Sequence, residues 1–388
     1  MLYLLILINP LLSMVFYIYC INDKKNNISK EYLYLSLFLG IIGMGMPIIG
    51  NVDLLRHYYR YETVNINIPI LDYLKLHKDF FIHLVYYYGR LFHIKKEFMT
   101  LLVVFLAYFY FFKSFYLVSK KSRDKIKNIM FILFFMNISF ANLVYGLRTL
   151  LAVSLFLYGI CQILILKRKK GFLFIFFANT VHFMSILYTC LFVLLRIYKN
   201  YPRVRKYIFY LSVVFAILPV NIIQNMIRCI LLALPFESYQ KLINVYVDGY
   251  WGIEYLKDRS LKGSIYIYLL AIKYVWLFIY TKKYCLKSNV SLAKKYLCLL
   301  VSLSFILFPL PKLRERYLDL PILFSIILYM CEKIKVKRYT YFLVIISCLY
   351  FFMEIFKTRL AILPIAIKLL YPTIYSIFFD NIDYMIQL

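Results

Sequence analysis

The sequence predicts an all-α integral membrane protein with about 10–12 transmembrane helices or half-helices. Of its 388 residues, 63% are hydrophobic and 20% aromatic, and the mean hydropathy is +0.74, whereas soluble domains are about half apolar and a quarter charged. Apolar runs long enough to cross a hydrocarbon core about 30 Å thick recur along the chain. They do not alternate as transmembrane β-strands do. We therefore expect residues 1–388 to form a single multi-pass membrane domain.

The apolar runs define the expected elements in order. They are residues 1–21, 31–50, 97–118, 128–145, 146–166, 172–195, 207–234, 263–281, 296–310, 317–331 and 339–356. The first run lacks the basic region and cleavage site of a signal peptide, so we expect a retained helix. The eight cysteines have no metal-site or disulfide spacing and are expected to be packing residues.

Charge in the linkers predicts the orientation. More than half of the 47 lysine and arginine residues lie in six short linkers, and the positive-inside rule makes these linkers cytoplasmic. They are 22–30, 119–127, 167–171, 196–206, 282–295 and 332–338. The other linkers have mixed charge and include the long loops 51–96 and 235–262, which we expect outside, as we do both termini. Topology thus explains the formal charge of +29 better than nucleic-acid binding does.

One apolar run conflicts with simple alternation of sides. Residues 172–195 are flanked by two basic linkers, which can both be cytoplasmic only if the run turns inside the membrane, near 179–182. Such a turn needs protein or a water-filled cavity around it. It would place His182 at the tip of a re-entrant hairpin. The alternative is a single crossing with one basic linker outside.

The first external loop opens with a dense group of ionisable and phenolic side chains, including Asp53, Arg56, Tyr58 and Tyr59. Arginine can bind phosphate, tyrosine can stack on a sugar ring, and a carboxylate can accept a hydroxyl proton. An acid at the end of an apolar helix is costly unless it is paired or hydrated. The alternative for the tyrosines and arginine is an interfacial belt.

Two further candidates lie inside or beside apolar runs. Arg148 begins a run, and boundary arginines are functional candidates unless they snorkel to head groups. His182 is the only histidine within an apolar run. It is either a titratable catalytic group or a hydrogen-bonded core residue.

The third basic site is a proline-bounded turn that contains Arg314, Arg316 and Tyr317. Two arginines one residue apart can bracket a diphosphate, because a guanidinium donates two hydrogen bonds to one phosphate. The alternative is a surface turn paired through Glu315. The predicted orientation places this turn on the same outer face as Asp53, Arg56 and Arg148.

These motifs resemble the Wzy-type and EpsG-like polysaccharide repeat-unit polymerases of bacterial envelopes. The similarity rests on the order of four features along the chain. They are Asp53 with the tyrosines up to Tyr61, Gly146-Leu147-Arg148 with the lysine-rich turn 167–170, Val181-His182, and Arg314-Glu315-Arg316-Tyr317.

The resemblance implies a glycosyltransferase that polymerises undecaprenyl-diphosphate-linked oligosaccharides for O-antigen, capsule or exopolysaccharide. It would act at the outer face of the bacterial cytoplasmic membrane, among membrane lipids and with a chain-length regulator as a further candidate partner. Arginines would stabilise the leaving diphosphate without a metal or cofactor. His182 or Asp53 would be the base.

Two alternatives stay open. A flippase for lipid-linked oligosaccharides would also be polytopic and basic, but we find no internal repeat, and the charges gather at one face. An O-antigen ligase, another lipid-carrier glycosyltransferase or a membrane acyltransferase would use a similar His and Arg set.

Overall fold

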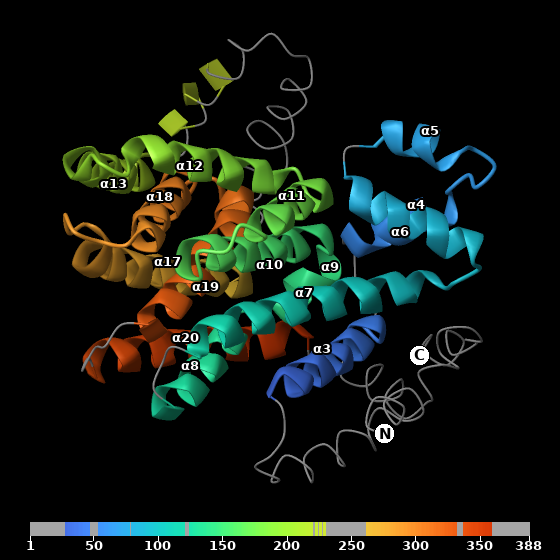
Figure 1. The fold of residues 1–388 in the computed structure, drawn as a ribbon, viewed down its shortest axis with the longest axis horizontal. Coiled ribbons are helices and arrows are strands. Elements are labelled where there is room, and N and C mark those ends of the chain that lie inside the picture. The colour runs from blue at the N-terminus through green and yellow to red at the C-terminus, as the bar shows by residue number, and fades with distance from the viewer. Residues whose placement is uncertain are drawn as a thin grey trace. The chain divides into compact units, whose positions relative to one another are not determined.

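The structure is a computed structural model, and it describes residues 28–46, 53–77, 79–120, 124–219, 261–331 and 337–358, with a few positions between 222 and 229. In these ranges the chain forms helices and no strands, as the sequence predicts (Figure 1). The helices form two compact units. The predicted external loop 235–262 lies almost wholly outside the described residues.

The first unit takes its described helices from residues 28–120 and 139–186. They are α3 (Ile28–Met44), α4 (Asp53–Glu62), α5 (Ile70–Lys75), α6 (Phe80–Leu91), α7 (Lys96–Ser119), α9 (Phe140–Tyr145), α10 (Arg148–Ile160) with its π-helical extension η1 (Cys161–Ile165), and α11 (Gly171–Val181). Helix α3 packs along α7, and α10 packs between α7 and α11 (Figure 1). The core of this unit is therefore built on α7 and α10.

Small residues permit the close approach of α3 to α7. A Cβ atom on Gly40 would lie 2.9 Å from the backbone oxygen of Leu101, and one on Gly43 would lie 2.9 Å from a methyl group of Val104. In lipid, helices associate through such close packing because the surrounding tails are as apolar as the side chains. A larger residue at either glycine would push the helices apart.

The second unit contains residues 121–138 and 187–353. Its helices are α8 (Asp124–Met136), most of α12 (Met184–Tyr198), α13 (Pro202–Ile217), α17 (Leu261–Tyr280) with η2 (Thr281–Cys285), α18 (Leu292–Ile306), α19 (Pro311–Cys331) and most of α20 (Lys337–Thr358). Helix α18 packs against α13 and α19, and α8 packs against α19. A hydrogen bond of 3.0 Å from Trp276 Nε1 to Ser325 Oγ ties α17 to α19.

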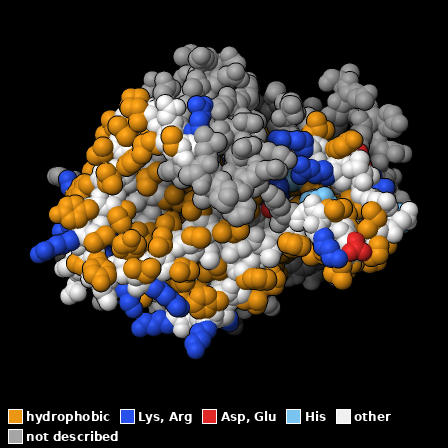
Figure 2. Space-filling model, turned by 90° about the horizontal axis from the view of Figure 1, so that it is seen from above, with side chains coloured by type: hydrophobic (Ala, Val, Ile, Leu, Met, Phe, Trp, Pro, Cys, Tyr) orange, Lys and Arg blue, Asp and Glu red, His pale blue; other side chains and the backbone are white. Residues whose placement is uncertain are grey.

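Two of the described helical stretches are long and apolar enough to cross a membrane, Lys96–Ser119 and Arg148–Ile165. Shorter apolar stretches are Glu31–Met44, Gly171–Val181, Met184–Tyr198 and Tyr339–Met353. Large hydrophobic side chains are exposed on several helices, for example Phe176 on α11 and Leu211 on α13. Figure 2 shows such side chains over much of the described surface in that view. Large exposed apolar surfaces are uncommon on water-soluble monomers, and this exposure agrees with the membrane environment that the sequence predicts.

Three predicted elements can be compared directly with the structure. Segment 51–96, expected as a loop, is largely helical, because it folds into α4, α5 and α6. The run 128–145, expected as one span, is broken after Met136, and the Ser139 side chain accepts a hydrogen bond of 3.1 Å from Asn142 N to begin α9. The predicted break at His182 is confirmed, since α11 ends at Val181 and α12 begins at Met184. The return of the chain as a hairpin stays a prediction.

Candidate active site

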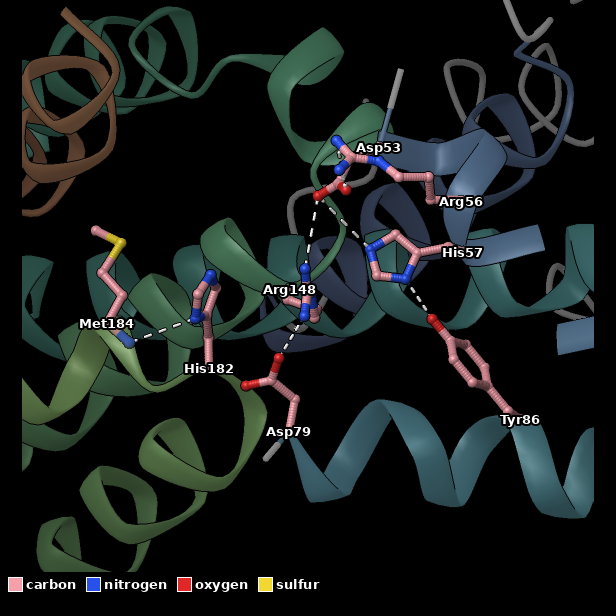
Figure 3. Close-up of polar contacts among 8 residues, drawn as sticks. All are labelled: Asp53, Arg56, His57, Asp79, Tyr86, Arg148, His182 and Met184. Carbon is pink, nitrogen blue, oxygen red and sulfur yellow. Dashed lines mark hydrogen bonds and ion pairs between the residues drawn. The ribbon is translucent and has the colours of Figure 1, made fainter. Parts of the chain in front are cut away.

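Asp53 is the first residue of α4, where the positive end of the helix dipole stabilises a carboxylate. One oxygen, Oδ1, lies 3.2 Å from Arg56 Nη2, and the other, Oδ2, lies 3.6 Å from Arg148 Nη2 (Figure 3). The Asp53 side chain is 28% exposed. It is therefore an ionisable group that a ligand can reach.

Arg148 joins this carboxylate to a second one. Its Nη1 donates a hydrogen bond to Asp79 Oδ2, and the Arg148 and Asp79 side chains are 18% and 8% exposed. Arg148 is the first residue of α10, and a cation is unfavourable beside the positive end of a helix dipole. Two carboxylates offset that cost. Snorkelling to head groups, the alternative that the sequence left open, does not describe this side chain.

His57 lies one turn after Asp53 on α4 and is buried. Burial, and secondarily Arg148, lowers the pKa of His57 to about 3, although Asp53 opposes the shift. The imidazole is thus neutral near pH 7. Burial also raises the pKa of Tyr86, so its hydroxyl stays protonated and can donate to His57 Nδ1. That bond leaves the proton on Nε2, which lies 3.8 Å from Asp53 Oδ2 (Figure 3).

A second group of aromatic rings packs α5 and the residues just after it against α6. The Tyr73 hydroxyl lies 3.0 Å from His83 Nδ1, and the rings of His83 and His77 stack with centroids 3.6 Å apart. Burial, followed by the charge of His77, lowers the pKa of His83 to about 3. These aromatic contacts hold α5 against α6, the helix that begins directly after Asp79.

The other candidates on this first unit differ in accessibility. The side chain of Arg56 is 56% exposed, and Tyr59 is 67% exposed. Tyr58 is buried, with its hydroxyl 2.8 Å from Thr100 Oγ1, which describes a packing residue between α4 and α7. Of the two predicted sugar-stacking tyrosines, Tyr59 is therefore the one that a sugar could reach.

His182 is buried at the break between α11 and α12, in an extended conformation. Its Nδ1 accepts a hydrogen bond of 3.3 Å from the backbone N–H of Met184, and its carbonyl accepts one of 2.8 Å from Ser185 Oγ. Figure 3 shows the His182 ring between Met184 and Arg148 in that view. Its predicted role as a base remains a prediction.

Arg314, Arg316 and Tyr317 lie in the first turns of α19, in the second unit. Arg314 is buried, and its guanidinium carbon lies 5.2 Å from the centre of the Phe308 ring. The carbonyl of Arg314 accepts from the Tyr274 hydroxyl at 3.5 Å, and that of Arg316 accepts from the Tyr188 hydroxyl at 3.5 Å. The turn is thus a packed structure. Its convergence with Arg148 stays a prediction.

Three members of the cluster around Asp53 were not singled out from the sequence as site residues. They are His57, Asp79 and Tyr86. His57 could have been found from its i, i+4 spacing to Asp53 on a helix. The roles of Asp79 and Tyr86 depend on how α6 returns beside α4, which the sequence does not encode locally. Among the described residues, no group of three His, Cys, Asp or Glu side chains is arranged to hold a metal ion.

Comparison with known families decides the class of protein. The sequence matches the EpsG family over residues 49–367, which include every site residue discussed above. The chain belongs to the EpsG family. This is the family of Wzy-like polysaccharide polymerases, so the resemblance inferred from the motifs is confirmed. No curated protein and no solved structure matches the chain.

Membership in the EpsG family indicates a polysaccharide polymerase-like function of the glycosyltransferase type. Together with the apolar helices, it also indicates a membrane protein. The match begins just before Asp53 and continues past α20. The match therefore covers the described helices of both units except α3.

Proposed function

We propose that this EpsG-family protein polymerises oligosaccharide repeat units carried on undecaprenyl diphosphate, at the outer face of the bacterial cytoplasmic membrane. The observation that carries the proposal is the partly exposed Asp53 carboxylate, held between Arg56 and Arg148 on a chain of the EpsG family. A carboxylate in reach of a ligand suits an acceptor hydroxyl, and the exposed guanidinium beside it suits a phosphate.

In the proposed reaction, an acceptor hydroxyl attacks the anomeric carbon of a lipid-linked chain. A new glycosidic C–O bond forms, and the C–O bond to the diphosphate breaks with its electron pair. Asp53 takes the hydroxyl proton and later releases it to water, and undecaprenyl diphosphate leaves with the negative charge. No nucleotide enters the reaction.

Negative charge develops on the leaving diphosphate, and fixed positive charge beside it stabilises the transition state. We propose Arg56, Arg314 and Arg316 for this role. Arg148 was expected to share it, but two carboxylates already offset its charge. A diphosphate approaching Arg148 would meet that negative charge as well.

Asp53 is the preferred base for a geometric reason. A base must come within hydrogen-bond reach of the hydroxyl that it deprotonates. Asp53 is 28% exposed, whereas His182 is buried and already accepts a hydrogen bond through Nδ1. His57 is buried as well, and its lowered pKa makes it a weak base. His182 is kept as the second candidate.

A deletion strain complemented in trans tests this function. Without the protein, cells should accumulate single repeat units on the lipid carrier at the outer face and make no long polymer. The wild-type gene should restore the polymer, and Asp53→Asn should not. Accumulation on the inner leaflet would indicate a flippase instead. Normal polymer that fails to reach its final acceptor would indicate a ligase.

A further inference from the structure

The carboxylate of Asp79 does not make the hydrogen bond that an acid at its position in the chain ordinarily makes. Asp79 immediately precedes α6, the N-cap position, where an aspartate side chain commonly accepts a hydrogen bond from the first turn of the helix. Here the side chain makes no capping hydrogen bond. It instead bonds Arg148 through Oδ2, while Oδ1 is buried and has no hydrogen-bond partner in the described part of the chain.

Arg148 transmits this placement to Asp53. A guanidinium is planar and rigid, so fixing one terminal nitrogen constrains the other. Nη1 is held by Asp79, and Nη2 lies 3.6 Å from Asp53 Oδ2. The backbone of Arg148 is anchored too, because Leu150 to Ile160 in α10 are all buried. A shift of Asp79 would therefore move Nη2 relative to the Asp53 carboxylate.

Exposure increases along the three side chains. It is 8% for Asp79, 18% for Arg148 and 28% for Asp53. The end of the row that a substrate can reach is Asp53, and Asp79 is the end buried farthest from solvent. An effect of Asp79 on the position of the Asp53 carboxylate would then pass through Arg148, which contacts both acids.

We infer that Asp79 is a positioning residue for the proposed reaction, which holds Arg148 so that Arg148 fixes the Asp53 carboxylate. The inference rests on the proposed function, because it assigns Asp53 to the acceptor hydroxyl. It gives the Asp79–Arg148 pair a role apart from phosphate binding. Misplacement of a reacting group by about 1 Å can cost about a hundredfold in rate.

A double-mutant cycle in proteoliposomes tests the inference. The substrate is the lipid-linked repeat unit extracted from the deletion strain, and the readout is kcat and KM for chain elongation. Asp79→Asn should lower kcat by about ten- to a hundredfold and change KM by less than about threefold. Because Asp79 acts through Arg148, the double variant Asp79→Asn/Arg148→Gln should be no slower than Arg148→Gln alone. Effects that multiply would overturn the inference.

Asp72→Asn is the matched control. Asp72 is an exposed acid on the same segment, and it pairs with Lys75 at 2.7 Å. Its substitution should leave kcat unchanged. An equal loss of kcat in the Asp72 and Asp79 variants would mean that any lost acid on this segment matters, and would contradict a specific role for Asp79.

Removing one partner of a buried ion pair can also destabilise the fold. Asp79→Glu keeps the charge and therefore separates the two roles. If Asp79 only neutralises Arg148, Asp79→Glu should restore both protein level and kcat. If it positions Arg148, the added methylene should leave the protein folded but kcat still reduced. Full kcat in Asp79→Glu overturns the inference, and this variant carries the test if Asp79→Asn does not insert.

The proposed function fails separately. If wild-type protein elongates no chain from the extracted substrate, the polymerase proposal is wrong. If wild-type protein elongates chains and Asp53→Asn does not, while every Asp79 variant keeps wild-type kcat, only the positioning role is wrong.

Discussion

The hydroxyl of Tyr86 on α6 bonds Nδ1 of His57 on α4, 29 positions away in the chain. The other ring nitrogen of His57, Nε2, faces the Asp53 carboxylate at 3.8 Å. A carboxylate beside Nε2 favours the tautomer that is protonated there, and the phenol hydroxyl then donates to Nδ1. The same bond joins α4, which begins at Asp53, to α6, which begins directly after Asp79.

Tyr86→Phe should reduce polymerisation severalfold, because without the phenol the proton of His57 can shift to Nδ1 and leave a lone pair facing Asp53. The stability cost should be about 1 kcal/mol, typical of one hydrogen bond. Chain-elongation kinetics and thermal unfolding in detergent measure the two effects. Tyr73→Phe is the control, since it removes the analogous bond of 3.0 Å to His83, on the same segment. Equal activity loss in both variants would show general loosening of α4 to α6.

Acidification should destabilise the protein through its buried histidines. Burial holds the pKa of His57, and that of His83, at about 3 in the folded chain, whereas unfolded histidine titrates near 6.5. The stabilisation is complete above about pH 6.5 and is lost as the pH falls toward 3, by at most about 1.4 kcal/mol per pH unit for each histidine.

Thermal midpoints in detergent between pH 7 and 4 measure this effect. His57→Gln should flatten the loss of stability on acidification, and exposed His93→Asn should not. A wild-type midpoint that does not fall with pH would show that these imidazoles are not buried and neutral.

How much could be predicted from the sequence depends on the range of the interaction. The helix break at His182 follows from basic linkers on both sides of one apolar run, and the structure contains it. Arg148 could be singled out because an arginine beginning an apolar helix is costly anywhere. These signals are local, so a single sequence is sufficient to read them.

The missed features depend on contacts between distant segments. Asp79 lies 69 positions before Arg148, and nothing around it marks it as a partner. The expected loop 51–96 is helical because its aromatic side chains bury against one another, as Tyr86 and Tyr61 do in an edge-to-face contact. A hydropathy window averages the apolar and polar faces of such amphipathic helices and therefore does not reveal them. The run 128–145 is the exception, because its break is set locally by the Ser139 cap, a signal that the continuous apolarity of the run hid.

Arginine variants should separate phosphate ligands from structural residues. Alanine at Arg56, Arg314 or Arg316 should abolish long polymer while the protein still inserts, because each variant removes charge from the proposed diphosphate site. Lysine should restore activity only in part, since it keeps the charge but not the two-pronged geometry. Arg203→Ala, at an exposed arginine of the predicted cytoplasmic linker 196–206, is the control. Full-length polymer from the Arg56, Arg314 and Arg316 alanine variants would remove these arginines from the site.

Reporter fusions test the predicted orientation. Alkaline phosphatase, which is active only outside the cytoplasm, should be active when fused after Asn65 and inactive after Lys170, because the basic linkers are expected inside. A fusion after Leu388 should be active, since both termini are expected outside. Activity after Lys170 but not after Asn65 would reverse the orientation and move the Asp53 cluster to the cytoplasmic face.

Elongation by purified protein is the most direct test of the central claim, that Asp53 is the base of a lipid-linked polymerase. Wild-type protein in liposomes, supplied only with lipid-linked repeat units from the deletion strain, should make a ladder of longer chains. Asp53→Asn should lower the rate by about two to four orders of magnitude, the usual cost of losing a general base, while His182→Ala should retain most of it. A normal ladder from Asp53→Asn together with none from folded His182→Ala would contradict the account and make the buried histidine the base.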